Sequence, residues 1–160
     1  MPSPQGENDV RLRRLLPGDL LPARWPAGFV MRTFQASDAA ALYELLELVF
    51  DDGMNGSFDQ WWSRLEADSE FDPELCFLVF DHDGRLAGAA LSWTSGFLKD
   101  LAVDPAFRGK GIAEALLWHV FASFAARGVS HIDLKTNLVD NAAAVRLYAR
   151  LGMVEVDWGG

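Results

Sequence analysis

The stretch FLKDLAVDPAFRGKGIA, Phe97–Ala113, decides how the rest of the chain is interpreted. Its first half predicts an apolar strand that ends at Asp104-Pro105, and a short turn follows that carries Arg108, Lys110 and two glycines. The turn leads directly into a long amphipathic helix. The unpaired N–H groups in the first turn of a helix and the positive end of its dipole both attract anions. We therefore expect an anion-binding site where this helix begins.

Taken alone, the segment RGKGIA does not identify the anion. It has neither the GxxxxGK[ST] spacing of a nucleotide-binding P-loop nor a GxGxxG pattern. Small Gly-Lys-Gly turns also occur without any ligand. The backbone N–H groups at a helix start suit a phosphate or pyrophosphate, with Arg108 and Lys110 as additional cationic contacts.

The composition indicates one soluble globular domain with a hydrophobic core. The chain has 160 residues, of which half are apolar. A formal net charge of −9 argues against a nucleic-acid or anionic-membrane surface. No apolar stretch is long enough to span a bilayer, and residues 1–10 carry no signal-peptide pattern. We therefore expect a cytoplasmic protein without nucleic-acid or membrane partners.

The number and position of cysteines limit the possible disulfides, metal sites and nucleophiles. The single cysteine, Cys76, excludes an internal disulfide and a multi-cysteine zinc site, and we expect no metal. It lies in the apolar run LCFLVF, which is typical of a buried small side chain rather than of a nucleophile.

The N-terminal half of the chain predicts a leader, a strand, two helices and a meander. Residues 1–26, rich in proline and with a basic cluster, are expected to be a loosely attached, partly disordered leader with a short helical turn at 11–16. Ser37 is expected to cap the first helix, and Ser57 with Gln60 to form a capping box for the second. An acidic connector at 66–74 follows. Antiparallel strands are predicted at 28–34, 75–80, 85–93 and 97–103, with a hairpin turn at 81–84.

The C-terminal half changes from hairpins to a crossover. A helix over about 110–127 ends at Gly128, a strand follows at 131–136, and strand, helix and strand together predict a parallel connection. A last helix over 141–151 and a short strand at 153–158 complete the order. The fold class is α+β: residues 27–160 form one domain with a mixed, mostly antiparallel β-sheet flanked by helices.

A second motif lies in the last helix, in DNAAAVRLYARLGM. Asn141 and Tyr148 are seven residues apart, which is two helical turns, so they lie on the same helix face. Each has a purely structural alternative: Asn141 as a capping residue, and Tyr148 as a core aromatic with its hydroxyl at the edge.

Together the two segments resemble the GCN5-related N-acetyltransferase (GNAT) family. The acyl-CoA signature of that family, [RQ]-x-x-G-x-[GA] after a strand ending in V-D-P, is similar to residues 101–113, with Arg108, Gly111 and Ala113 at its fixed positions. A second signature, N-x-x-A-x-x-L-Y-x-x-x-G-[FM], is matched by Asn141, Ala144, Leu147, Tyr148, Gly152 and Met153. The resemblance covers residues 28–158 and implies a GNAT-like acyl-CoA N-acyltransferase fold.

The resemblance implies a transferase that moves an acetyl group directly from acetyl-CoA, as cosubstrate, to a primary amine of a small molecule or protein. It implies that the main chain of Leu101, Ala102 and Val103 pairs with the pantetheine arm. It also implies that N–H groups from Arg108, Gly109, Lys110, Gly111, Ile112 and Ala113 hold the pyrophosphate. Asn141 would contact the cosubstrate near pantetheine, and Tyr148 would protonate the departing thiolate.

The acceptor amine must lose a proton before or during attack, directly or through water. Asp100, on the strand beside the expected thioester, is the first candidate base. Its alternative is a local charge pair with Lys99 or Arg108. His82 is a weaker candidate, and Asp51 and Asp52 would suit a cationic acceptor.

The chain departs from the family at its C-terminus, since members usually continue into a further strand that closes the sheet. This sequence ends at Gly160. Either the sheet is open at that edge or a partner subunit supplies the strand, and an unprotected edge favours a homodimer. Two other functions compete with catalysis: a non-catalytic acyl-CoA-binding regulatory module, and nucleotide binding at the 108–113 turn.

Overall fold

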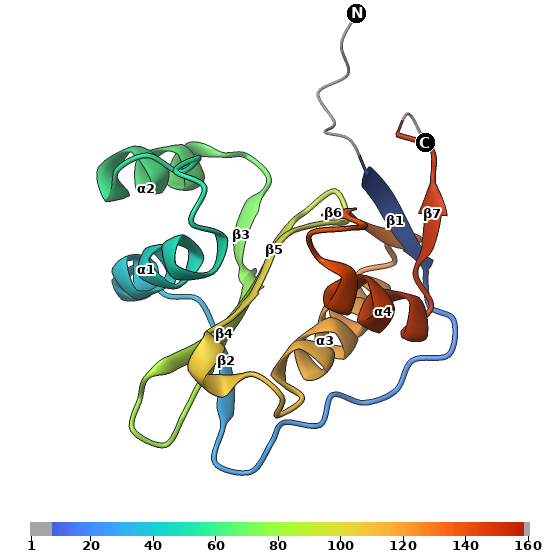
Figure 1. Ribbon diagram of the computed structural model, residues 1–160, viewed down its shortest axis with the longest axis horizontal. Coiled ribbons are helices and arrows are strands. Elements are labelled where there is room, and N and C mark those ends of the chain that lie inside the picture. The colour runs from blue at the N-terminus through green and yellow to red at the C-terminus, as the bar shows by residue number, and fades with distance from the viewer. Residues whose placement is uncertain (1–7, 159–160) are drawn as a thin grey trace, which may run out of the picture.

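A computed structural model describes residues 8–158. It contains one open sheet with helices on both faces (Figure 1). The strands are β1 (Asp9–Leu15), β2 (Val30–Thr33), β3 (Phe71–Phe80), β4 (Leu86–Trp93), β5 (Phe97–Val103), β6 (His131–Asn137) and β7 (Val154–Val156). The α-helices are α1 (Ala39–Phe50), α2 (Phe58–Ala67), α3 (Ile112–Ala126) and α4 (Ala142–Arg150), and 3-10 turns lie at Ala36–Asp38 and Pro105–Phe107.

The sheet order is β2-β3-β4-β5-β6-β1-β7, and every neighbouring pair is antiparallel except β5–β6. The predicted α+β class with a mixed, mostly antiparallel sheet is therefore confirmed. The parallel pair is β5–β6, which α3 connects, as the crossover pattern indicated. The main difference in element length is in β3, which begins at Phe71, inside the segment expected to be an acidic connector.

The two faces of the sheet are covered by different helices, α1 and α2 on one face and α3 and α4 on the other (Figure 1). Each face has its own apolar core. Helix α3 approaches β4 closely because Gly88 has no side chain: a Cβ atom there would lie 2.8 Å from Cγ2 of Ile112. The small residues of β4 thus set how near the start of α3 comes to the sheet.

Helix capping was predicted correctly for α2 and incorrectly for α1. Ser57 and Gln60 form the expected reciprocal capping box. Before α1, a 3-10 turn intervenes and Ser37 is not the cap. The carboxylate of Asp38 accepts the Gln35 N–H at 2.8 Å and pairs with Arg32, and the hydrogen bond from Arg32 lowers the pKa of Asp38. The carboxylate of Asp38 thus holds the 3-10 turn before α1, and neither it nor Ser37 caps α1 through its side chain.

The N-terminal segment contradicts the expectation of a loose leader with a helical turn. Residues 9–15 form strand β1, which pairs with β6 along its whole length and with β7 on its other side. Its alternating pattern puts Val10 and Leu12 into the core below α3 and α4. The part of the leader at 1–7 lies outside the described residues.

A buried carboxylate explains why an arginine-rich strand can lie inside the sheet. Asp133 of β6 is 0% exposed and accepts hydrogen bonds from Arg11 Nε at 2.7 Å and from Arg13 Nε at 2.8 Å. Burial opposes its ionisation, but the hydrogen bonds from Arg13 and Arg11 outweigh burial and lower its pKa. The arginines therefore neutralise one buried charge instead of lying in solvent.

Strand β1 lies between β6 and β7, and β7 is an edge strand of the sheet. Among the residues that the structure describes, the sheet is therefore open at β7, which is the first of the two alternatives that the sequence allowed.

Replacing Asp133 with asparagine should destabilise the protein by about 3 kcal/mol at neutral pH, because two arginines lose their charge partner. Urea unfolding measures this, with the exposed Asp157→Asn variant as control. A carboxylate with a lowered pKa stabilises the fold above its unfolded pKa of about 3.9, and the contribution is lost as pH falls through the folded value. The difference should therefore shrink in acid; a pH-independent or negligible difference would contradict the role of Asp133.

Candidate functional site

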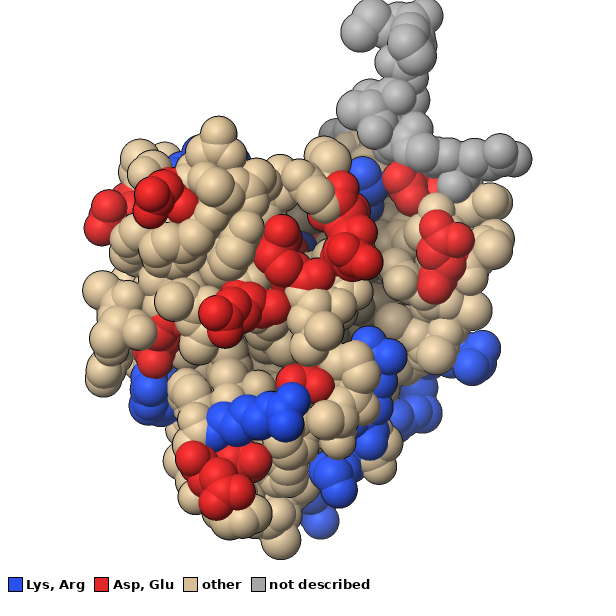
Figure 2. Space-filling view, turned by 60° about the vertical axis from the view of Figure 1, so that its left-hand side comes forward, with Lys and Arg blue, Asp and Glu red and all other residues tan. Residues whose placement is uncertain are grey.

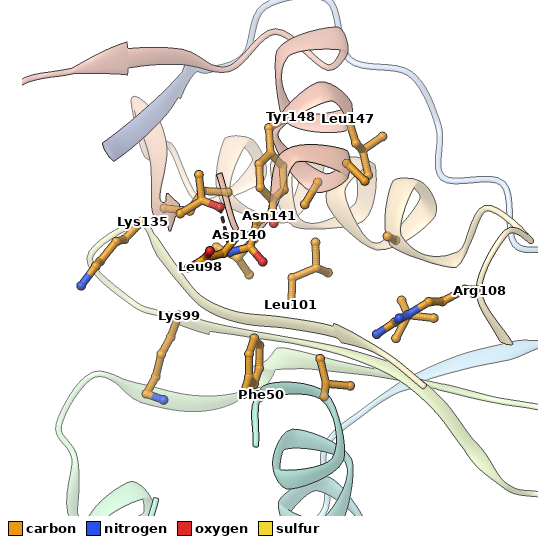
Figure 3. A pocket seen from close by; sticks show the side chains of 17 residues that line it. Phe50, Leu98, Lys99, Leu101, Arg108, Lys135, Asp140, Asn141, Leu147 and Tyr148 are labelled. Atoms are coloured by element: carbon orange, nitrogen blue, oxygen red, sulfur yellow. Dashed lines mark hydrogen bonds between the residues drawn. The ribbon is translucent and has the colours of Figure 1, made fainter. Parts of the chain in front are cut away.

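The central feature of the site is a wedge between the two parallel strands. β5 and β6 pair only at Phe97 with Asp133 and at Leu98 with Leu134, and beyond these residues they diverge. A cavity of about 550 Å³ lies in the wedge (Figure 3). Its lining comes from α1, β5, the loop before α3 and the first turn of α3, β6, the turn after β6, and α4. The lining residues are Val49, Phe50, Leu98, Lys99, Leu101, Val103, Arg108, Ala113, Leu134, Lys135, Thr136, Asp140, Asn141, Ala143, Ala144, Leu147 and Tyr148.

One edge of β5 is left without a strand partner along this wedge, among residues 8–158. Its register with β4 skips Lys99, which makes a bulge, and Leu101 and Val103 then face the cavity. Ala102 points to the opposite face and is buried under α1 and α2. An unpaired strand edge presents N–H and C=O groups that can hydrogen-bond an extended ligand as an added strand would.

The loop that follows β5 is held by hydrogen bonds at its start, and its backbone N–H groups are accessible at its end. The carboxylate of Asp104 accepts the Ala106 N–H at 2.9 Å and pairs with Arg85 at 2.9 Å. Gly109 and Gly111 have φ of 78° and 89°, and a Cβ atom on either would meet nothing within 4 Å. These backbone conformations suit glycine, and they leave the N–H groups at the start of α3 accessible.

A second cavity, of about 250 Å³, adjoins the wedge at this loop. Arg108, Gly109, Gly111, Ile112 and Ala113 line it, together with residues of α3 and α4. Lys110, the remaining member of the predicted set, lines neither cavity. Most of the predicted strand and loop residues therefore line these two adjoining cavities, whereas Ala102 and Lys110 line neither.

Helix α4 places Asn141 and Tyr148 on the wall of the wedge opposite β5 (Figure 3). Asn141 is the residue before the helix, but its side chain does not cap it: Nδ2 donates to Thr136 Oγ1 at 3.4 Å. Tyr148 is 8% exposed, and burial raises its pKa to about 12. Its phenol is therefore protonated at neutral pH, and it can serve as a proton donor.

Asp100 does not face the wedge. Its carboxylate is 2.9 Å from Lys99 Nζ, which is the local charge pair that the sequence allowed as an alternative. The bulge at Lys99 shifts the alternation of side chains along β5. As a result Leu101 faces the wedge, and Asp100 points to the α1 and α2 side of the sheet. His82 lies in an exposed turn and does not line the cavity either.

The carboxylate that does line the wedge is Asp140, which sequence reasoning missed. It lies in the turn between β6 and α4, where its N–H donates to Asn137 Oδ1 at 2.9 Å. The available signal was its position directly before Asn141, in the loop that carries the second motif. Cys76, in contrast, is completely buried as expected, and burial raises the pKa of its thiol, which disfavours a nucleophilic role.

A third cavity, of about 340 Å³, lies on the α1 and α2 side of the sheet. Lys99 lines both this cavity and the wedge, so the two adjoin through that side chain. The other lining residues include Met54, Trp61, Arg64 and Trp93. The tryptophans of this region thus pack in the core and also form a wall of the third cavity.

Charges are distributed unevenly around these hollows. Figure 2 shows acidic side chains around the hollow in the middle of the view and a strip of basic side chains at its lower right. Within residues 8–158 no group of three or more His, Cys, Asp or Glu side chains is arranged to hold a metal ion, and no helix is long and apolar enough to cross a membrane.

Comparisons with known proteins agree on one family. The model of the acetyltransferase (GNAT) family matches residues 39–153. The chain is 36% identical over 134 residues to a mycothiol acetyltransferase of Clavibacter michiganensis, which covers 78% of this chain and 42% of that protein. It is 32% identical over 130 residues to a streptothricin acetyltransferase of Streptomyces lavendulae, covering 78% of this chain and 62% of that protein.

A solved structure supports the same conclusion. A GCN5-related N-acetyltransferase from Sphaerobacter thermophilus superposes with a TM-score of 0.81 and 32% identity, over 92% of this chain and 48% of that one. The chain thus spans less than two thirds of the length of each of these three relatives.

The raised pKa of Tyr148 can be tested directly. The chain has two tyrosines, so a ¹³C-tyrosine NMR titration resolves them, and the Tyr148→Phe variant assigns the signals. The Cζ resonance of Tyr148 should stay unchanged up to about pH 11, because the burial that raises its pKa to about 12 keeps the phenol protonated. A midpoint near the ordinary tyrosine value of about 10 would show that the hydroxyl is solvated.

Proposed function

The chain belongs to the acetyltransferase (GNAT) family, and from this premise we propose that it transfers an acetyl group from acetyl-CoA to a primary amine. The observation that carries the proposal is the wedge between β5 and β6. It combines an unpaired strand edge, an open helix N-terminus and a buried tyrosine along one depression.

The depression suits the shape and charge of acyl-CoA from end to end. The pantetheine arm carries amides in an extended chain, which the free edge of β5 at Leu101–Val103 can hydrogen-bond. The pyrophosphate is anionic, and the N–H groups of the glycine loop and the dipole of α3 favour it at the adjoining cavity. Arg108 lines both cavities and adds a cationic contact between the two.

Within the wedge, the chemistry requires stabilisation of a developing oxyanion. Attack of an amine on the thioester carbonyl puts negative charge on its oxygen. Because β5 and β6 stop pairing after Leu98 and Leu134, main-chain N–H groups of β5 close to Leu101 have no strand partner on the wedge side among residues 8–158. Such fixed donors cost no reorganisation during the reaction, so they stabilise the transition state more than they stabilise the bound substrate.

Tyr148 is the proton donor in this proposal. A free thiol has a pKa of about 8.5 and tyrosine a pKa of about 10, so in water the transfer would be slightly uphill. The site raises the pKa of Tyr148 to about 12 by burial. The same burial disfavours the thiolate of the leaving group, so both partners shift in the same direction and the proton transfer remains accessible.

Asp140 is the carboxylate best placed to receive the incoming ammonium, because it lines the wedge beside Asn141. It attracts the cation and accepts its proton, directly or through water. Asp100 as the base stays a prediction that the geometry does not favour, since its carboxylate pairs with Lys99. The third cavity, which adjoins the wedge at Lys99, is the proposed place for the rest of the acceptor.

A cytoplasmic location and a homodimer stay predictions from the sequence. The relatives differ in the acceptor that their names give, so the amine is proposed here by chemical class alone.

Replacing Tyr148 with phenylalanine tests the function. We expect kcat to fall about 100-fold, because the thiolate loses its proton donor, while the Kd for acetyl-CoA changes less than about threefold. Thiol release from acetyl-CoA is measured with a diamine, an amino sugar and a peptide with a free α-amino group. Ser123→Ala, which removes a hydroxyl that bonds only within α3, is the matched control.

The two competing functions predict different results, one in this experiment and one in a thermal-shift comparison of ATP with CoA. Tight binding of acetyl-CoA without acetylation of any amine would favour the non-catalytic module, as would a Tyr148→Phe variant indistinguishable from the parent. Stronger thermal stabilisation by ATP than by CoA would favour nucleotide binding. Either result would overturn the proposal.

A further inference from the structure

The third cavity, on the α1 and α2 side of the sheet, has three charged side chains on its lining. They are Arg64, Asp68 and Lys99, and Trp61 and Trp93 contribute to its apolar wall. At about 340 Å³ the cavity has room for a small organic group, and it adjoins the wedge at Lys99. A molecule whose amine lies in the wedge can therefore extend into it, and the charges there affect which molecules bind.

The charge of Lys99 already has a partner. Its Nζ lies 2.9 Å from the carboxylate of Asp100 and 5.9 Å from the centre of the Trp93 ring. Where the two cavities meet, Lys99 therefore contributes its methylene stem as wall more than it contributes a free charge.

The guanidinium of Arg64, in contrast, makes no ion pair with any residue from 8 to 158. Its Nη2 donates to the main-chain oxygen of Asn55 at 2.8 Å, which directs the guanidinium toward the loop between α1 and α2. The loop is itself held to α1, since Asn55 Nδ2 donates to Glu47 at 3.2 Å. The remaining N–H groups of Arg64 have no acceptor in the part of the chain that the structure describes, so they are available to a ligand.

Asp68 is the one carboxylate on the lining of this cavity. It follows Arg64 by four residues, a spacing at which opposite charges on a helix can pair, yet the two form no ion pair within residues 8–158. Its Oδ1 instead accepts the N–H of Glu70 at 2.8 Å, in the turn after α2. Asp68 thus holds that turn and leaves the charge of Arg64 without a partner.

The wedge and the third cavity together suit a molecule with opposite charges at its two ends. Asp140, the proposed contact for the incoming ammonium, lines the wedge, and Arg64 lines the adjoining cavity. An acceptor that carries an ammonium at one end and an anion at the other would meet an opposite charge at each end. Its amine would then be directed toward the thioester.

We propose that the acceptor carries an anionic group, a carboxylate or a phosphate, at the end remote from its amine, and that Arg64 binds this group. A planar guanidinium donates paired hydrogen bonds to either anion. The inference rests on the proposed acetyl transfer to an amine and deepens it by naming the class of acceptor. Arg64 is then a residue that determines specificity and takes no part in the chemistry.

The experiment compares amines that share a carbon chain and differ in the far terminal group. Hexylamine, 6-aminohexanoate, 6-aminohexyl phosphate and 1,6-diaminohexane are tested as acceptors with acetyl-CoA, and so are their four-carbon counterparts. In the parent protein kcat/KM should be about tenfold higher for one of the anionic amines than for the neutral amine of the same chain, because the anion accepts charge-assisted hydrogen bonds from Arg64. The anion with the larger ratio distinguishes a carboxylate from a phosphate acceptor.

Three variants test the residue. Arg64→Gln should bring the ratio of anionic to neutral amine to about one. Asp68→Asn should raise the ratio, since it removes the nearby negative charge and keeps the oxygen that accepts the Glu70 N–H. Arg127→Gln, which pairs with Asp72 and lines neither the wedge nor the third cavity, should keep the ratio of the parent. Because each protein supplies its own ratio, a partly unfolded variant cannot imitate these results.

The outcomes separate the subsite from the function on which it rests. Equal use of anionic and neutral amines, a preference for the diamines, or failure of this series while the amino sugar or the peptide is acetylated would each overturn the anion subsite alone. An unchanged ratio in Arg64→Gln or a lost ratio in Arg127→Gln would do the same. Absence of acetylation of every amine, the amino sugar and the peptide included, would overturn the proposed function itself.

Discussion

The site depends on the point at which β5 and β6 stop pairing. Within residues 8–158, two parallel strands that separate after Leu98 and Leu134 leave an unpaired edge on each strand, and both edges face the wedge. On the other side each strand keeps a partner, β4 for β5 and β1 for β6, so both strands stay in the sheet where they separate. The free edge of β5 at Leu101–Val103 is the one that we propose pairs with the ligand.

Asp133 lies at the apex of this arrangement. It is opposite Phe97 in the first of the two parallel pairs between β5 and β6, and opposite Arg13 in the antiparallel ladder between β6 and β1. Its carboxylate is held by Arg11 and Arg13, so the same residue joins all three strands where two of them begin to diverge. Helices α3 and α4 then follow the ends of the separated strands, which is why Arg108 of the glycine loop and Tyr148 of α4 line one cavity.

Local signals predicted most of the scaffold. The bounds of β5, the capping box of α2 and the two motifs follow from neighbouring residues, and the structure brings Asn141 and Tyr148 to the same wall. The role of residues 9–15 could not be predicted, because the partner of their arginines, Asp133, is more than 100 positions away. The orientation of Asp100 could not be predicted either, because it depends on the bulge at Lys99. A bulge arises from the pairing of two strands, and the sequence of one strand does not reveal it.

A crystal structure with CoA tests the central claim, that the wedge between β5 and β6 is the binding site for the thioester arm. The account predicts that the pantetheine amides hydrogen-bond the main chain of β5 at Leu101–Val103, with the sulfur beside the hydroxyl of Tyr148. A CoA molecule bound outside the wedge, or a complex in which β6 pairs with β5 along its length and closes the cavity, would contradict it.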